Sequence, residues 1–159
     1  MSAFSEGNIA VITGAASGIG LAAARRLAGM GLIVCMVDRS EAALVAAAKE
    51  IGSNATPFVV DVADPVAMHR LATEVADRFG PVSFLMNNAG IGRGGDALSN
   101  PDGWTRVLDV NLFGVVHGVQ AFVPAMVASD RPGIVVNTGS KQGITQPLAT
   151  RPITSARPR

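Results

Sequence analysis

The sequence predicts an α/β fold, in which helices cover both faces of one parallel sheet. Apolar runs of strand length alternate with amphipathic segments of helix length along most of the chain, and this alternation is typical of successive βαβ units. The chain has 159 residues, 48% of them hydrophobic, which is enough for one domain with a sizeable core. The alternation stops after Gly143, so we expect a doubly wound sheet that is incomplete at its C-terminal edge.

Three strand–helix pairs are predicted in the first half of the chain. The strands are expected at Ile9–Thr13, Leu32–Val37 and Phe58–Asp61, and the helices at Ile19–Met30, Ser40–Ile51 and Pro65–Phe79. Both faces of the second strand are apolar, as expected for a buried parallel strand. Gly31 is a typical end for the first helix, and Asp64 followed by Pro65 is a typical start for the third.

The second half contains two further strands and one long helix. The expected elements are a strand at Val82–Met86, a loop at Asn87–Asn100, a helix at Trp104–Val127 and a strand at Ile134–Asn137. We expect Pro124 to bend or end the helix. Its most apolar part, Val115–Ala128, is shorter than the roughly 20 residues of a membrane span, which favours a core helix. Residues 1–143 are predicted to form the domain, and residues 144–159 an irregular tail.

Composition argues against several classes of function. Lys and Arg total 13 and Asp and Glu total 12, which gives a net charge of +1. The basic residues are scattered, so we expect no nucleic-acid partner. The one cysteine, Cys35, lies in an apolar run and is expected to be buried and unpaired. We expect no metal site, and the N-terminal segment lacks the features of an export signal, which predicts a cytoplasmic protein without a membrane partner.

A glycine-rich turn between the first strand and the first helix carries a functional signal. Gly14 permits a tight exit from the strand, Gly18 lets the backbone approach a ligand, and Gly20 lets the helix pack closely on the sheet. Main-chain amides and the positive end of the helix can hold a pyrophosphate at such a turn. No Lys-Ser/Thr pair follows, which argues against a nucleoside-triphosphate P-loop. The predicted cofactor contacts here are Thr13, Gly14, Ser17, Gly18, Ile19 and Gly20.

Asp38 follows Gly20 by 18 residues and lies at the end of the second predicted strand. An acidic residue at this distance is expected to accept hydrogen bonds from an adenosine ribose and to repel a 2′-phosphate. This favours NAD over NADP, although the guanidinium of Arg39 could pair with that phosphate. The alternative is that Asp38 only caps a loop.

Further motifs resemble those of the short-chain dehydrogenase/reductase family, from about Gly7 to Gly143. The glycine spacing, the acidic residue after the third strand and the Asn-Asn-Ala-Gly sequence after the fourth strand all match the family pattern. The resemblance implies a Rossmann-like fold and hydride transfer between a nicotinamide cofactor and a small-molecule alcohol or ketone. The further cofactor contacts that it implies are Asp61, Val62, Asn88, Ala89 and Gly90.

Two catalytic positions of the family also have matches in this chain. Asn111 matches the family's catalytic asparagine, and Ser140 matches the serine that hydrogen-bonds the substrate oxygen. Each residue also has a structural alternative. Asn111 could satisfy backbone groups inside a helix, and Ser140 could end a strand.

The tyrosine and lysine of the family's active site are missing from this chain. The family's spacing from Ser140 places them at Ile153 and Arg157, and the chain contains no tyrosine. A frameshift between about Gly143 and Ala149 is our hypothesis for the loss. Hydride transfer at a carbonyl carbon needs a proton donor with a tuned pKa, so we expect the chain to be inactive although its intact relatives are oxidoreductases.

Two other functions remain open at this point. One is a noncatalytic dinucleotide-binding or interaction module, which the missing tyrosine and lysine favour. The other is a methyltransferase with a similar nucleotide turn, against which the Asn87–Gly90 motif argues. The resemblance also allows a homo-oligomer through the fourth helix. The strand edge at residues 134–136 is expected to be exposed, which predicts association or marginal stability.

Overall fold

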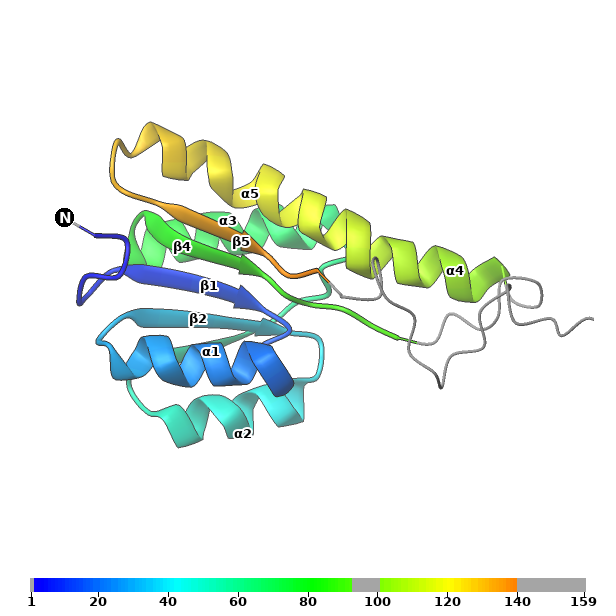
Figure 1. Cartoon of the computed structure of the whole chain (residues 1–159), viewed down its shortest axis with the longest axis horizontal. Coiled ribbons are helices and arrows are strands. Elements are labelled where there is room, and N and C mark those ends of the chain that lie inside the picture. The colour runs from blue at the N-terminus through cyan, green and yellow to red at the C-terminus, as the bar shows by residue number, and fades with distance from the viewer. Residues whose placement is uncertain (1, 93–100, 140–159) are drawn as a thin grey trace, which may run out of the picture.

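The computed structural model describes residues 2–92 and 101–139. In these ranges the chain forms a five-stranded sheet of order β3-β2-β1-β4-β5, in which every neighbouring pair is parallel (Figure 1). The strands are β1 (Ile9–Thr13), β2 (Ile33–Asp38), β3 (Ala55–Val59), β4 (Val82–Asn87) and β5 (Ile134–Asn137). The strand order reverses between β1 and β4, and a reversal of this kind opens a crevice at the carboxyl ends of the strands.

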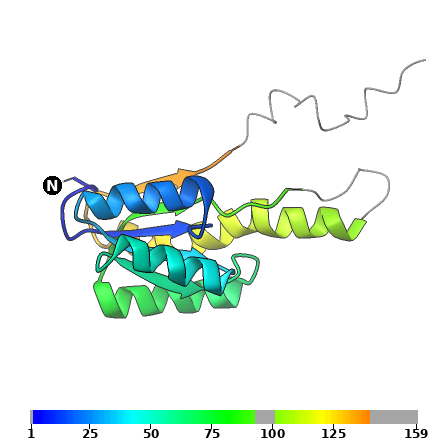
Figure 2. The same cartoon turned by 90° about the horizontal axis from the view of Figure 1, so that it is seen from below.

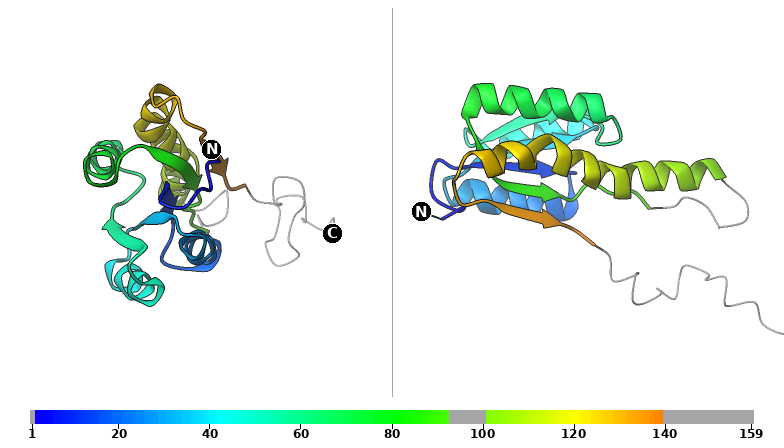
Figure 3. Two further views of the ribbon diagram at one scale, coloured as in Figure 1. Left: turned by 90° about the vertical axis from the view of Figure 1, so that its left-hand side faces the viewer. Right: turned by 90° about the horizontal axis from the view of Figure 1, so that it is seen from above.

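Helices lie on both faces of the sheet (Figure 3). The first two, α1 (Gly18–Gly29) and α2 (Glu41–Ile51), cover one face, and α3 (Pro65–Phe79) and α5 (Gly114–Ala128) cover the other. Before α5 the chain forms α4 (Pro101–Leu108) and a π-helical turn, η1 (Asp109–Phe113). α4 extends past the carboxyl ends of the strands (Figure 2). The predicted doubly wound α/β fold is confirmed.

Two apolar cores form, one on each face of the sheet, because successive strand residues point to opposite sides. In β1, Ala10 and Ile12 join the core under α1 and α2, whereas Ile9 and Val11 join the core under α3 and α5. All five residues of β1 are buried. This two-sided burial is the reason why the strand sequences are apolar without alternation.

The third strand was predicted too late in the sequence. It spans Ala55–Val59 instead of Phe58–Asp61, because its pairing with β2 begins where Ala55 lies beside Val34. Pro57 is tolerated within it because β3 is at the edge of the sheet, where a strand can lack one ladder hydrogen bond. The earlier end of the strand places Asp61 in the loop before α3.

The long helix begins earlier than predicted and does not end at Pro124. It begins at Pro101 instead of Trp104, and α5 continues through Pro124 to Ala128. Pro124 is exposed, so water can bond the carbonyl group that loses its helical partner. The irregularity is the π-helical turn at Asp109–Phe113. Such turns often occur at functional sites.

The helical segment Asp102–Ala128 is long and apolar enough, by length and composition only, to cross a membrane. The prediction from the sequence compared only Val115–Ala128 with the length of a membrane span, whereas the structure shows a longer helix. Phe122 and Met126 of this segment are buried in the core under α3 and α5, whereas its most apolar window as a whole is 28% buried. One helix of this kind is weak evidence for a span, and the expected absence of a membrane partner stays a prediction.

Candidate dinucleotide-binding site

A pocket with a cavity volume of about 80 Å³ lies at the carboxyl ends of the central strands. Its walls come from the turn after β1, the end of β2, the loop after β3, the segment after β4 and the π-helical turn η1. The lining residues are Gly14, Asp38, Arg39, Val60, Asp61, Val62, Ala89, Gly90, Ile91 and Val110. The pocket therefore brings together residues from four segments that sequence motifs had assigned to one cofactor.

The glycine turn lies directly against the segment after β4. Gly14 has a φ of +66° and Gly18 a φ of +55°, a left-handed conformation that a residue with a side chain rarely adopts. A Cβ atom on Gly14 would lie 2.8 Å from Cα of Ala89, and a Cβ atom on Gly20 would collide with the carbonyl oxygen of Gly14. These glycines let the turn and α1 approach the rest of the site closely.

The start of α1 can receive an anion. Its N-cap residue, Ser17, makes no side-chain capping hydrogen bond, so its hydroxyl does not occupy the first amides of the helix. Ser17, Gly18 and Ile19 are exposed. Amides at the N-terminus of a helix favour phosphate groups, because their N–H bonds and the helix dipole point toward the ligand.

Thr13 and Asn88 join the turn to the end of β4. The Thr13 hydroxyl oxygen accepts hydrogen bonds from the backbone N–H groups of Asn88 at 2.9 Å and Ala89 at 3.0 Å. In return, Nδ2 of Asn88 donates to the carbonyl oxygens of Thr13 at 3.1 Å and Gly14 at 3.4 Å. Both side chains hold the backbone of the site, and neither lines the pocket.

Asp38 has a structural contact and also lines the pocket. Its carboxylate accepts from the backbone N–H of Ala16 at 3.1 Å through one oxygen and from that of Ser40 at 3.0 Å through the other. Asp38 therefore does cap a loop, as the alternative interpretation of this residue predicted. Each carboxylate oxygen can accept a further bond, so capping does not exclude a ribose. Arg39 lies beside it and is exposed.

Asp61 and Val62 form the opposite wall, in the loop between β3 and α3. Oδ1 of Asp61 accepts from the backbone N–H of Ala63 at 3.0 Å. The Asp61 side chain is exposed, whereas Val62 is 5% exposed and belongs to the core under α3 and α5. Asp61 is thus an exposed acid next to a buried valine, a position suited to a contact with a ligand.

Asn111 lies in the π-helical turn and holds the segment after β4. Its Oδ1 accepts from the backbone N–H of Ile91 at 2.8 Å, and its Nδ2 donates to the carbonyl oxygen of Ile91 at 3.0 Å. The backbone groups that it satisfies thus belong to another segment, not to its own helix. Ser140, the second predicted catalytic residue, lies outside the described residues, as do the tail at 144–159 and positions Ile153 and Arg157.

The described ranges contain neither a cluster of metal ligands nor a reactive cysteine. No group of three or more His, Cys, Asp or Glu side chains that could hold a metal occurs within residues 2–92 and 101–139. Cys35 is buried in β2, and this burial raises the pKa of its thiol to about 12. The thiol is therefore neutral and unreactive in the folded protein.

The sequence motifs missed four residues of this site. Val60, Ile91 and Val110 line the pocket, and His117 bonds the loop after β3 through its Nδ1, 2.8 Å from the carbonyl oxygen of Val62. Ile91 directly follows the Asn-Asn-Ala-Gly motif, and Val110 directly precedes Asn111. These neighbouring motifs were the signal that could have identified both residues. His117 had no such signal, because its partner lies 55 residues away in the sequence.

Comparisons with known proteins give one consistent result. A family model described as short chain dehydrogenase matches residues 8–156. The galactitol 2-dehydrogenase (L-tagatose-forming) of Cereibacter sphaeroides is 44% identical over 87% of this chain and 54% of its own length. A short-chain dehydrogenase/reductase from Burkholderia phymatum, solved with NAD, has a TM-score of 0.87 and 36% identity over 92% of this chain and 53% of that one.

A metagenomic short-chain oxidoreductase solved with NADP has a TM-score of 0.78 and 35% identity over 83% of this chain and 62% of that one. The chain spans about half the length of the curated relatives it matches. The family-model match nevertheless covers nearly all of it. The chain belongs to the short-chain dehydrogenase family.

Proposed function

We propose that this chain binds NAD through the adenosine half of the cofactor. In this proposal Asp38 accepts hydrogen bonds from the ribose hydroxyls, the wall formed by Asp61 and Val62 receives the adenine, and the first amides of α1 hold the pyrophosphate. The observation that carries the proposal is that Gly14, Asp38 and Asp61 line one pocket although they come from three separate segments.

The residues present fit such a ligand. A side chain at Gly14 or Gly20 would fill the space between the turn and Asn88-Ala89, and the open start of α1 suits a diphosphate. When bound, the nicotinamide would supply or accept the hydride. The residues of this chain would position the dinucleotide. Thr13 and Asn88 hold the glycine turn, and Asn111 holds the backbone of Ile91.

The finer proposal is a preference for NAD over NADP. A family relationship leaves this question open, because relatives have been solved with either cofactor. Asp38 is half-buried at the pocket wall and its carboxylate would repel a 2′-phosphate. Arg39 is more exposed, so water screens its attraction for that phosphate.

We further propose that the chain itself is catalytically inactive toward the alcohols and ketones on which the family acts. The chain has no tyrosine, and a proton must be delivered to or removed from the substrate oxygen for turnover. Asn111 and Ser140 remain the proposed catalytic positions of the intact site. The noncatalytic dinucleotide-binding module is thus the alternative that the composition favours for this chain.

Binding measurements with matched variants test the cofactor proposal. We expect wild-type protein to bind NADH more tightly than NADPH, and not to bind S-adenosylmethionine. Asp38→Asn should weaken NADH binding about tenfold or more, because hydrogen bonds to a charged group contribute about 1.5–3 kcal/mol. The control is Glu41→Gln, which removes one negative charge from an exposed residue in the first turn of α2 outside the pocket.

Three results would contradict parts of this proposal. Equal affinity for NADH and NADPH would contradict the cofactor preference, and binding of neither would contradict a dinucleotide site. Steady turnover with a panel of polyols and their ketones would contradict inactivity.

We also propose a cytoplasmic location and self-association through the α4–α5 segment. Exposed apolar side chains recur every four residues along this segment, at Trp104, Leu108, Leu112 and Val116. A repeat of this kind forms one face of a helix. Leu108→Lys should therefore reduce the mass of any oligomer measured by sedimentation, and an unchanged mass would contradict this interface.

A further inference from the structure

One helical stretch, Val110–His117, contacts both walls of the proposed adenine pocket. On one side Val110 lines the pocket and Asn111 holds the backbone of Ile91 with two hydrogen bonds. On the other side Gly114 and His117 contact Val62. A Cβ atom on Gly114 would lie 2.7 Å from Cγ2 of Val62, so the helix approaches this loop as closely as a glycine permits.

His117 makes a long-range contact to the loop between β3 and α3. Its Nδ1 lies 2.8 Å from the carbonyl oxygen of Val62. Since a carbonyl oxygen can only accept, Nδ1 carries the proton and donates. Among the described residues, this imidazole is the one side chain from outside residues 60–64 that the structure shows hydrogen-bonded to that loop.

The peptide unit that His117 holds also carries a bond to Asp61. This unit joins Val62 to Ala63. Its carbonyl group accepts from His117, and its N–H group donates to Oδ1 of Asp61 at 3.0 Å. Rotation of this peptide plane would move both bonds together. The orientation of the Asp61 carboxylate is therefore linked to His117 through one rigid peptide.

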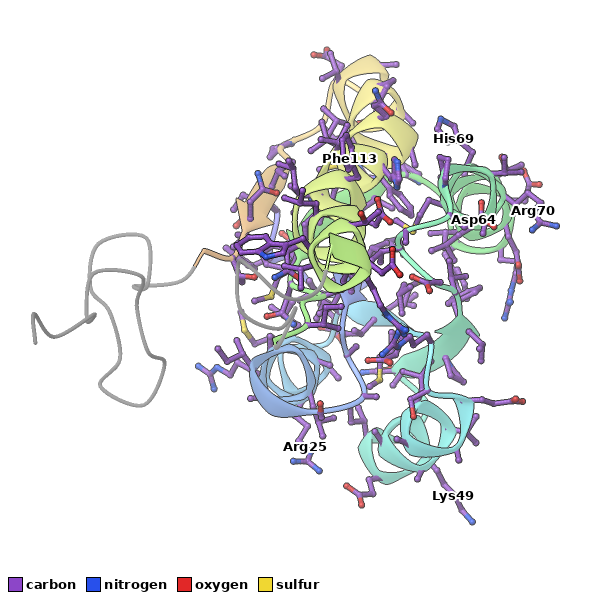
Figure 4. All side chains as sticks on the ribbon, turned by 90° about the vertical axis from the view of Figure 1, so that its right-hand side faces the viewer. Arg25, Lys49, Asp64, His69, Arg70 and Phe113 are labelled. Atoms are coloured by element: carbon purple, nitrogen blue, oxygen red, sulfur yellow. The ribbon has the colours of Figure 1, made fainter. Side chains whose placement is uncertain are left out.

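Phe113 lies next to the imidazole, one helical turn earlier in the chain. The two rings are stacked, with centroids 6.4 Å apart and planes inclined by 26°. Figure 4 labels Phe113, which comes from the helix and not from the loop. The His117 ring therefore has one neighbouring ring on its own helix and one hydrogen-bond partner on the loop, the carbonyl oxygen of Val62.

We propose that His117 is a positioning residue for adenine, which fixes the Val62–Ala63 peptide and so directs the Asp61 carboxylate toward the 6-amino group of the base. This inference rests on the proposed function. A carboxylate accepts from the amino group of adenine, but it faces an acceptor in hypoxanthine, which has an oxygen at that position. Loss of His117 should therefore reduce selectivity between the two bases.

The experiment compares the affinities of NADH and of reduced nicotinamide hypoxanthine dinucleotide, both followed by nicotinamide fluorescence. Wild-type protein should prefer NADH. In His117→Leu the ratio of the two affinities should fall about threefold or more, which corresponds to loss of one hydrogen bond. His117→Asn should restore the ratio, because its Nδ2 is separated from Cα by the same number of bonds as Nδ1 of histidine.

The matched control is His69→Leu. His69 is exposed on α3, points outward in Figure 4, and its Nδ1 lies 2.9 Å from the carbonyl oxygen of Pro65 in its own helix. Its substitution should leave the ratio unchanged. If His117→Leu does not fold, His117→Gln tests the inference instead. Glutamine keeps a donor but moves it one bond farther from Cα, so the ratio of the two affinities should be lower in His117→Gln than in His117→Asn.

The two proposals fail in different ways. If wild-type protein binds NADH but His117→Leu weakens both dinucleotides equally, or His117→Asn does not restore the ratio, the inference about His117 is overturned alone. If wild-type protein binds neither dinucleotide, the proposed function is overturned and this inference with it.

Discussion

Gly20 is in the first turn of α1, and within helices alanine is normally the better residue by about 1 kcal/mol. Here the site reverses that preference. A Cβ atom on Gly20 would collide with the carbonyl oxygen of Gly14 and lie 2.7 Å from Nδ2 of Asn88. Gly20→Ala should therefore destabilise the protein by about 1–3 kcal/mol, the usual cost of overpacking, and should weaken NADH binding. Urea unfolding followed by circular dichroism measures the first effect.

Gly29 provides the control within the same helix. It ends α1, and a Cβ atom there would meet nothing within 4 Å. Gly29→Ala should leave stability unchanged or raise it by up to about 1 kcal/mol. Equal effects of the two substitutions would show that helix propensity, and not the approach of the turn to Asn88, controls this position.

Single residues of the site were predictable where their role depends on local backbone chemistry. The turn glycines and Asp38 occur at fixed offsets from a strand and a helix, and the structure places Gly14, Asp38 and Arg39 in one pocket. His117 and Ile91 were not predictable in this way. Their roles arise from contacts 55 and 20 residues distant in the sequence, and no local pattern specifies such pairs.

At the scale of elements, α3 shows how one side chain can fix a helix start. Oδ1 of Asp64 accepts from the backbone N–H groups of Val66 at 2.9 Å and Ala67 at 3.0 Å. Asp64→Ala should cost about 0.5–2 kcal/mol of unfolding free energy. Asp64→Asn keeps an acceptor at the same position and should cost only a small part of that. A loss of equal size in both variants would attribute the effect to charge instead of capping.

Element boundaries followed the sequence where the end signals are local. The predicted range of β1 is correct, and the signals of Asp64 and Pro65 placed the start of α3 correctly. β3 was displaced because its limits are set by pairing with β2, and an edge strand can include Pro57. The π-helical turn was not predicted because an extra residue in one helical turn leaves no compositional pattern.

At the scale of the whole molecule, the thiol of Cys35 makes the free energy of unfolding depend on pH in the alkaline range. Burial raises the pKa of its thiol to about 12, whereas an unfolded cysteine titrates at about 8.5. The unfolded state therefore loses its proton first as pH rises. The stabilisation is complete below about pH 8.5 and is lost progressively as pH approaches 12, with a slope of up to about 1.4 kcal/mol per pH unit.

The composition makes this slope measurable, because the chain has no tyrosine and its only lysines are Lys49 and Lys141. Few other groups titrate in this range. Urea midpoints at several alkaline pH values should fall in wild-type protein and fall less steeply in Cys35→Ala. A similar slope in both proteins would show that another group controls alkaline unfolding.

Among the residues that the structure describes, the two edges of the sheet differ in how they resist pairing with another chain. At one edge β3 contains Pro57, and at the other β5 is an Ile-Val-Val-Asn strand with neither proline nor charge. Val135 of β5 is 38% exposed and lines a groove together with Val123, Met126 and Val127, to which Asp130 and Arg131 also contribute. Edge strands are normally protected by proline or lysine, so β5 is the edge from which we expect aggregation.

Val135→Lys should therefore reduce concentration-dependent aggregation, measured by light scattering and sedimentation. The matched control is Val59→Lys on β3, which introduces the same charge at an exposed position of the other edge. Its effect should be smaller, because Pro57 already interrupts that edge. Both variants change the net charge by the same amount, so a general gain in solubility would reduce aggregation equally. Equal reduction would thus contradict a role for the β5 edge, whereas reduction by Val135→Lys alone would locate the associating surface there.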